Sequence, residues 1–101
     1  MKVQFLDPAR TEFMEAVAYY GDQEEGLGLE FSAEVGKALE RILRYPEAWP
    51  LISKRTRRCR ISRFPYGIIY QIRQDTLVIV AVMHLHREPH SWRTRVPRRS
   101  Q

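Results

Sequence analysis

Two stretches in the first half of the chain place apolar residues at the spacing of a helix. Residues 7–20 and residues 25–44 each carry an apolar stripe with steps of three or four residues. This spacing predicts two amphipathic helices joined by a short turn, which favours a helical hairpin. The stripes are formed by Phe13, Ala16, Val17 and Tyr20 in the first helix and by Leu27, Phe31, Val35, Ala38, Leu39 and Ile42 in the second.

Local signals predict where the helical region begins and ends. Asp7 followed by Pro8 predicts the first helix, with Asp7 as its cap, because proline at the first position lacks only a donor that the helix does not use. Gly21 predicts the end of this helix. After the second helix we expect an ordered loop over residues 45–56, in which Trp49 packs on the core.

The remaining segments are typical of strands. Residues 2–6 and 57–62 alternate apolar and polar positions, whereas residues 66–73 and 77–85 are rich in β-branched and aromatic side chains. The short connection 74–76 favours an antiparallel hairpin, although it contains no glycine. We therefore predict an α+β fold of order β-α-α-β-β-β. Its helical hairpin packs on one face of a mainly antiparallel sheet and leaves the opposite face open to a ligand.

The length of the chain limits it to one domain. At 101 residues it can build one hydrophobic core but not two, so we expect a single domain in residues 1–96 and a basic tail in residues 97–101. Residues 93–101, with Pro97 and four arginines, are expected to fray into solvent. The single cysteine excludes an internal disulfide, and we recognise no signal peptide. The longest apolar run, residues 77–83, is far shorter than the ~20 residues of a membrane helix. These features predict a cytoplasmic protein that does not contact membranes.

Charge is segregated along the chain. Residues 1–40 carry three cations and nine carboxylates, whereas residues 41–101 carry fourteen cations, thirteen of them arginine, and three carboxylates. Arginine favours bidentate recognition of phosphates and carboxylates, so the second half is expected to form an exposed patch that captures an anionic target. The alternative interpretation is a solvated surface that only keeps the protein soluble.

The densest group of cations lies in residues 54–63. On a strand, Arg58 and Arg60 share one face, while Cys59 faces the core as an unreactive thiol. The arginines of this segment are candidates for holding a phosphodiester backbone or the carboxylates of a partner peptide. The candidate binding residues are Arg55, Arg57, Arg58 and Arg63, together with Trp92 farther along the chain.

The end of the last strand offers a second set of candidates. His84 and His86 share a face if the strand persists, and either could act as a general base in RNA cleavage. The alternative is that His84 packs at the strand end and His86 is solvated. No third ligand at suitable spacing accompanies them, so we expect no metal and no cofactor. Trp92 could stack on a base or a peptide, or it could cover the edge of the core.

In combination, these segments resemble the RelE/ParE toxin superfamily. The resemblance covers nearly the whole chain and includes the loop 45–50. It implies a small α+β toxin encoded beside an antitoxin, whose C-terminal segment folds across the toxin in a hetero-oligomer. The residues that carry it are Arg57-Arg58-Cys59-Arg60, Phe64-Pro65-Tyr66-Gly67-Ile68-Ile69-Tyr70 and Val82-Met83-His84-Leu85-His86-Arg87-Glu88-Pro89-His90-Ser91-Trp92.

The superfamily has two activities, which imply different targets. RelE-like members cut messenger RNA on the ribosome, and Arg60 and Arg87 match arginine positions of that pattern, with His84 or His86 as proton carrier. However, Gly67 stands where ribonuclease members have an arginine, and Trp92 occupies the region of their tyrosine. The segments around Gly67 and His86 are more similar to ParE-like members, which poison DNA gyrase. The resemblance therefore favours a gyrase-poisoning toxin of a plasmid-stabilisation type, with a ribosome-dependent endoribonuclease as the alternative.

Overall fold

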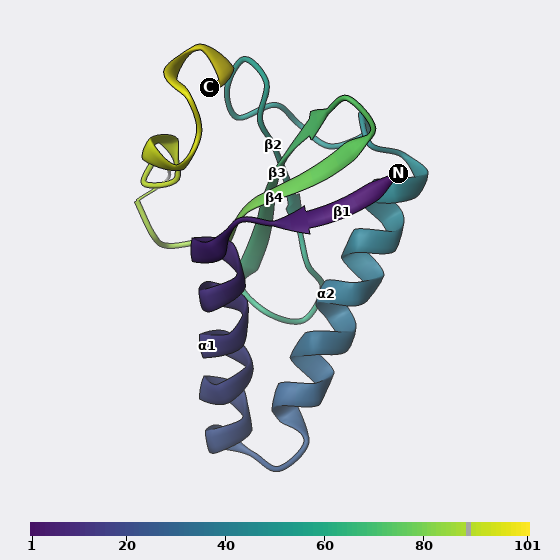
Figure 1. The fold of residues 1–101 in the computed structure, drawn as a ribbon. Helices are drawn as coiled ribbons and strands as arrows, with labels where there is room; N and C mark the ends of the chain where they lie inside the picture. Colours follow the sequence, from purple (N-terminus) through teal and green to yellow (C-terminus); the bar gives the residue numbers. More distant parts are fainter. Residues whose placement is uncertain (89) are drawn as a thin grey trace.

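The computed structural model describes residues 1–88 and 90–101, which form a helical hairpin packed on a four-stranded sheet (Figure 1). The strand order is β1-β4-β3-β2, and only the β1–β4 pair is parallel. The predicted α+β class and element order are therefore confirmed. The elements are β1 (Lys2–Phe5), α1 (Asp7–Gln23), α2 (Leu27–Arg44), β2 (Arg57–Arg60), β3 (Tyr66–Arg73), β4 (Thr76–His84) and the 3-10 helices η1 (Arg93–Arg95) and η2 (Arg98–Ser100).

The first helix starts and ends differently from the prediction. Asp7 is the first helical residue, and the cap is Leu6, so the Asp7 side chain does not cap the helix. The helix also continues past Gly21 to Gln23. The reversal takes place at Gly26, whose φ of 84° is a left-handed conformation that glycine adopts without strain.

The two helices approach each other closely just after this turn. A Cβ atom built on Gly28 would lie 2.5 Å from the carbonyl oxygen of Val17 on the facing helix. No larger residue fits at Gly28 without moving the backbone of one helix. The hairpin geometry therefore depends on this glycine.

β4 contains a bulge that changes which of its side chains face the helices. The pairing with β3 skips Val80, so Ile79 and Ala81 lie opposite successive residues of β3. As a result Ile79 faces the helices, Val80 and Ala81 both face away, and Val82 returns to the helix side. A strict two-residue alternation along β4 would place Ala81 and every later side chain on the wrong face.

The larger core lies between the helices and the sheet. Phe31 of α2 is fully buried at its centre, and its ring contacts the rings of Phe13, Tyr20, Phe64 and Tyr66 at centroid distances of 5.1–6.2 Å. Trp49, Tyr20 and Tyr70 pack in or against this core as predicted. The apolar stripes of both helices are thereby covered.

A second core covers the opposite face of the sheet, which was expected to be open. It forms because residues 91–101, here called the C-terminal strap, cross this face (Figure 1). Trp92 and Val96 of the strap are buried against Ile69, Val80 and Met83. The prediction that this face is open to a ligand is therefore wrong.

The end of the strap is also ordered, so the prediction of a fraying tail is wrong. The carbonyl group of Ser100 accepts a hydrogen bond from Gln71 Nε2 at 2.6 Å. The carbonyl group of Gln101 accepts hydrogen bonds from Ser53 Oγ and from the backbone N–H of Arg55. These bonds attach residues 97–101 to β3 and to the loop before β2.

Candidate functional site

Arg58 and Arg60 are the two candidate cations that project from the sheet on the strap side. In the β2–β3 register Arg58 lies opposite Ile69 and Arg60 opposite Gly67, and Arg60 is exposed. The aliphatic stem of Arg58 lies across Gly67, since a Cβ atom on Gly67 would be 3.1 Å from Arg58 Cγ and Cδ. A side chain at position 67 would therefore push this stem away from β3 by a few tenths of an ångström.

Arg57 and Arg63, two of the predicted binding residues, make structural contacts instead. Arg57 Nη1 donates hydrogen bonds to the carbonyl oxygens of Glu47 and Trp49, at 3.1 and 2.7 Å, and so holds the loop after α2. Arg63 donates to Glu30 Oε1 at 2.6 Å, and this bond raises the pKa of Arg63. Each guanidinium group therefore links the sheet side of the molecule to the helical side.

The structure does not group the two other candidate binding residues, Trp92 and Arg55, with Arg58 and Arg60. The Trp92 side chain is 0% exposed, so its ring covers the core and offers no surface for stacking on a base or a peptide. This burial corrects its prediction as a binding residue, and the alternative that it covers the core is the one observed. Arg55 is exposed and lies beside the end of the strap.

The two histidines meet at the end of β4. The bulge turns His84 towards the side of the sheet on which α1 lies. There the centroid of its ring is 5.3 Å from the ring centroid of Tyr66 on β3. His84 Nδ1 accepts a hydrogen bond from the backbone N–H of His86 at 3.1 Å, and the two rings are 5.2 Å apart. Among the described residues, no group of three or more His, Cys, Asp and Glu side chains could hold a metal ion.

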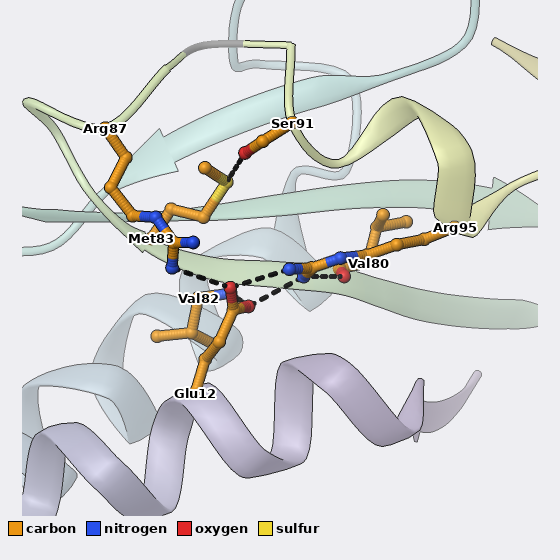
Figure 2. Close-up of polar contacts among 7 residues, drawn as sticks. All are labelled: Glu12, Val80, Val82, Met83, Arg87, Ser91 and Arg95. Atoms are coloured by element: carbon orange, nitrogen blue, oxygen red, sulfur yellow. Dashed lines mark hydrogen bonds and ion pairs between the residues drawn. The ribbon is translucent and has the colours of Figure 1, made fainter.

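Glu12 of α1 organises the cations on this side of the sheet (Figure 2). Its carboxylate accepts two hydrogen bonds from Arg95 at 2.7 and 2.8 Å and one from Arg87 at 3.3 Å. The Glu12 and Arg95 side chains are only 10% and 16% exposed. A bidentate pair in this setting is strong, and it binds the strap to α1.

The same pair completes the edge of β4. The register with β1 ends at Ile79, so the next residues of β4 have no neighbouring strand on that side. There Glu12 Oε1 accepts the backbone N–H of Val82 at 3.1 Å, and Arg95 Nη1 donates to the carbonyl group of Val80 at 3.1 Å. Two side chains thus take the place of a longer β1.

A groove of about 510 Å³ runs between α1 and the ends of β3 and β4. Arg87, His84 and Tyr66 line one part of it, so it contains two of the candidate catalytic residues. The carboxylates of Glu12, Glu15 and Asp22 line the same groove. These three negative charges oppose the binding of a phosphate group there.

Arg58 and Arg87 approach each other on the other side of His84. They line a hollow of about 20 Å³ together with Gly67, Met83 and Leu85. Arg60 is not part of the lining. The structure therefore brings His84 and Arg87 together with Arg58 rather than with Arg60, the expected catalytic partner.

Burial controls the chemistry of the thiol and of one tyrosine. Cys59 is fully buried, and burial raises the pKa of its thiol, as expected for an unreactive core cysteine. Burial also raises the pKa of Tyr70 to about 12, and its hydroxyl group donates a 2.7 Å hydrogen bond to the carbonyl group of Pro46. Both residues are structural.

Sequence analysis did not find Glu12 and Arg95. Glu12 lies off the apolar stripe of the first helix, among the nine carboxylates of residues 1–40, and Arg95 lies in the C-terminal segment that was expected to fray. They are 83 residues apart, and no local spacing connects them. The sequence offered one signal: a glutamate lies next to the apolar stripe of α1, and arginines are in excess near the C-terminus.

Comparisons with known proteins identify the family. A solved chain of the chromosomal ParDE TA system from P. aeruginosa has the same fold, with a TM-score of 0.70 and 11% sequence identity, over 83% of this chain and 95% of that chain. The search of curated proteins found no match. None of the helices in the described part of the chain is long and apolar enough to cross a membrane. The family model described as the ParE toxin of the type II toxin-antitoxin system, parDE, matches residues 3–89. The chain therefore belongs to the ParE toxin family, whose members are paired with an antitoxin.

Proposed function

We propose that this chain inhibits growth by binding and poisoning DNA gyrase in the cytoplasm, without an active site of its own. A cognate antitoxin neutralises it in a hetero-oligomeric complex. The observation that carries this proposal is the environment of Arg87, which is paired with Glu12 beside a groove that contains two further carboxylates. A phosphate that binds Arg87 in this groove would compete with Glu12 and lie next to Glu15 and Asp22.

The surroundings of Gly67 support the same conclusion. Ribonuclease members of the superfamily carry an arginine at this position, and removing one cation that stabilises a transition state costs on the order of 100-fold in rate. The stem of Arg58 occupies the space above Gly67. Binding is therefore better supported than cleavage.

We place the contact with gyrase on Arg58 and Arg60. Among the described residues neither takes part in an ion pair, and both project from β2 on the side away from the helices. Arg60 is exposed and Arg58 is half-buried, and arginines that are not already engaged by the protein's own carboxylates are available for a bidentate contact with a target. Arg57, Arg63 and Trp92 are left out of this surface because their side chains hold the fold together.

One observation favours the alternative, a ribosome-dependent endoribonuclease. Arg58, His84 and Arg87 line one hollow, so two cations and a proton carrier lie close together. Such a group can in principle stabilise a phosphate and move a proton. The hollow is small, however, at about 20 Å³, and it would have to open to admit a nucleotide.

The test compares two activities of the purified protein. We expect the wild-type protein to stop supercoiling by gyrase and to leave ribosome-bound messenger RNA intact. Arg60→Glu should raise the concentration needed for half-inhibition by about tenfold or more, because it places a carboxylate where the target binds a cation. Arg10→Glu is the matched control, since Arg10 is exposed on α1, and it should inhibit gyrase like the wild type.

Two results would contradict the proposal. Messenger RNA cut at defined codon positions by the wild type, and no longer by Arg87→Ala, would establish the nuclease instead. Equal inhibition of gyrase by Arg60→Glu and Arg10→Glu would show that the β2 cations, Arg58 and Arg60, do not form the surface that binds gyrase.

A further inference from the structure

The two ends of the molecule carry opposite charge. Nine of the twelve carboxylates belong to residues 1–40, and the tip of the helical hairpin is acidic. The end of the strap and the β3–β4 turn lie at the other end of the elongated molecule, which measures 42 × 27 × 21 Å (Figure 1). This second end is rich in arginine.

The strap brings together cations from three separate segments at this end. Arg98 and Arg99 directly precede Ser100, whose carbonyl group accepts a hydrogen bond from the Gln71 side chain. The backbone N–H of Arg55 donates a hydrogen bond to Gln101, the last residue of the strap. A hollow of about 310 Å³ is lined by Arg55, Arg73 and Ser100, together with Gln71, Ile72 and Gln74. We call the group of cations around this hollow the strap-end patch: Lys54, Arg55, Arg73, Arg98 and Arg99.

The strap-end patch is not neutralised by the rest of the chain. Among the described residues none of its cations forms an ion pair, whereas Arg63, Arg87 and Arg95 are all paired with glutamates of the helices. Arg73 donates its hydrogen bonds to the neutral side chain of Gln71. The carboxylates closest in the sequence are Asp75 in the turn and Glu47 in an adjoining groove. The patch thus carries five positive charges that no ion pair among the described residues offsets.

We propose that the strap-end patch binds the phosphodiester backbone of duplex DNA. Five of the six residues that line its central hollow are polar, which suits a phosphate group. Four of the five cations are arginine, which binds phosphate through two parallel hydrogen bonds. Cations on three segments can contact several phosphates at once, as sequence-independent binding requires.

This inference goes beyond the proposed contact with gyrase. Arg98 and Arg99 lie outside residues 3–89, the part of the chain that matches the ParE family. DNA binding by the patch is therefore a property of this chain's own C-terminal strap. The gyrase contact is placed on Arg58 and Arg60, so either proposal can fail while the other holds.

The test measures DNA affinity directly. The full chain is titrated into a fluorescently labelled 20-base-pair duplex, and anisotropy is recorded over a series of salt concentrations. The variant Arg98→Ala/Arg99→Ala should bind about tenfold or more weakly at low salt. If each arginine contacts one phosphate, the slope of log affinity against log salt should fall by about 1.8.

The controls separate a specific patch from general charge. Arg10→Gln/Lys37→Gln removes two cations from the helical hairpin and should leave the affinity and the slope near those of the wild type. Thermal melts establish that both double variants are folded. The proposal is overturned if the two double variants lose affinity equally, or if labelled poly-glutamate binds the wild type as tightly as the duplex does.

Discussion

The two faces of the sheet are covered in different ways. The helix side is covered by two long helices whose apolar stripes are regular, and its centre is the ring of Phe31 among four other aromatic rings. The strap side is covered by eleven residues with one buried tryptophan, and it is attached through the pair Glu12–Arg95 and a few main-chain bonds. The first core depends on repeated packing, whereas the second depends on a few single contacts.

This difference predicts different responses to mutation. Loss of one side chain on the helix side removes contacts on which both helices and the sheet depend. Loss of one contact on the strap side releases a terminal segment that can detach without unfolding the rest. The following variants test that distinction, from the largest expected effect to the smallest.

Phe31→Ala is expected to have the largest effect. It removes a fully buried ring from the helix-side core and should lower the free energy of unfolding by about 4 kcal/mol. Urea denaturation followed by circular dichroism measures this change. Leu29→Ala is the control, because Leu29 lies on the same helix and is largely exposed, and its effect should be near zero. A small effect of Phe31→Ala would mean that the helix side is not the main core.

Trp92→Ala tests the strap side. It should cost about 3 kcal/mol at most, because detachment of the strap limits the loss once the ring is gone. Hydrogen exchange distinguishes the two faces: the amides of Arg55 and Val96 should exchange faster, while those of α2 remain protected. Equal loss of protection in the strap and in α2 would show that the two cores unfold as one unit.

Glu12→Gln weakens the link between the strap and α1. It keeps the shape of the side chain but leaves the half-buried Arg95 without its opposite charge, so we expect a loss of about 2 kcal/mol. Chemical denaturation gives the value, and Glu15→Gln, on the exposed side of the same helix, is the control. Glu12→Leu/Arg95→Met removes both charges but also leaves the backbone N–H of Val82 and the carbonyl group of Val80 without their side-chain partners, so we expect it to be less stable than Glu12→Gln. If the double variant is as stable as the wild type, the pair contributes only charge compensation.

Tyr70→Phe should have the smallest effect and a defined pH dependence. Loss of the hydrogen bond to Pro46 costs about 1 kcal/mol. Because burial raises the pKa of Tyr70 from 10.0 to about 12, the folded state favours the neutral phenol, and this stabilisation is complete below pH 10 and lost as the pH rises to 12. Tyr70→Phe should therefore lose less stability than the wild type between pH 10 and 12. Parallel curves for the two proteins would contradict this assignment.

The helix side was predictable from the sequence because its signals are local. The stripes of residues 7–20 and 25–44 and the β-branched runs of the strands indicate the elements, and short connections limit how they pair. The same signals placed Cys59, Trp49 and Tyr70 in the core. Local rules were less exact at the ends of α1, where Leu6 and Gly26 take the places expected for Asp7 and Gly21.

The strap side was not predictable, because its contacts join residues that are far apart in the sequence. A segment with four arginines and a proline looks like a solvated tail, yet Trp92 and Val96 attach it to the sheet. The bulge at Val80 leaves no mark in an unbroken apolar run, but it turns His84 towards α1. For the same reason the arginines do not form the single patch that was expected. Some are paired with glutamates of the helices, whereas Arg58 and Arg60 on β2 and the cations of the strap-end patch form two separate groups.

The contact between Arg58 and Gly67 has a consequence for how activities can change within this superfamily. A side chain introduced at Gly67 would press on the stem of Arg58, because its Cβ atom would lie 3.1 Å from Arg58 Cγ and Cδ and the stem would have to shift by a few tenths of an ångström. An arginine at position 67 would therefore also move the guanidinium group of Arg58. The effects of substitutions at these two positions should depend on each other, so that a change of activity at one of them involves the other.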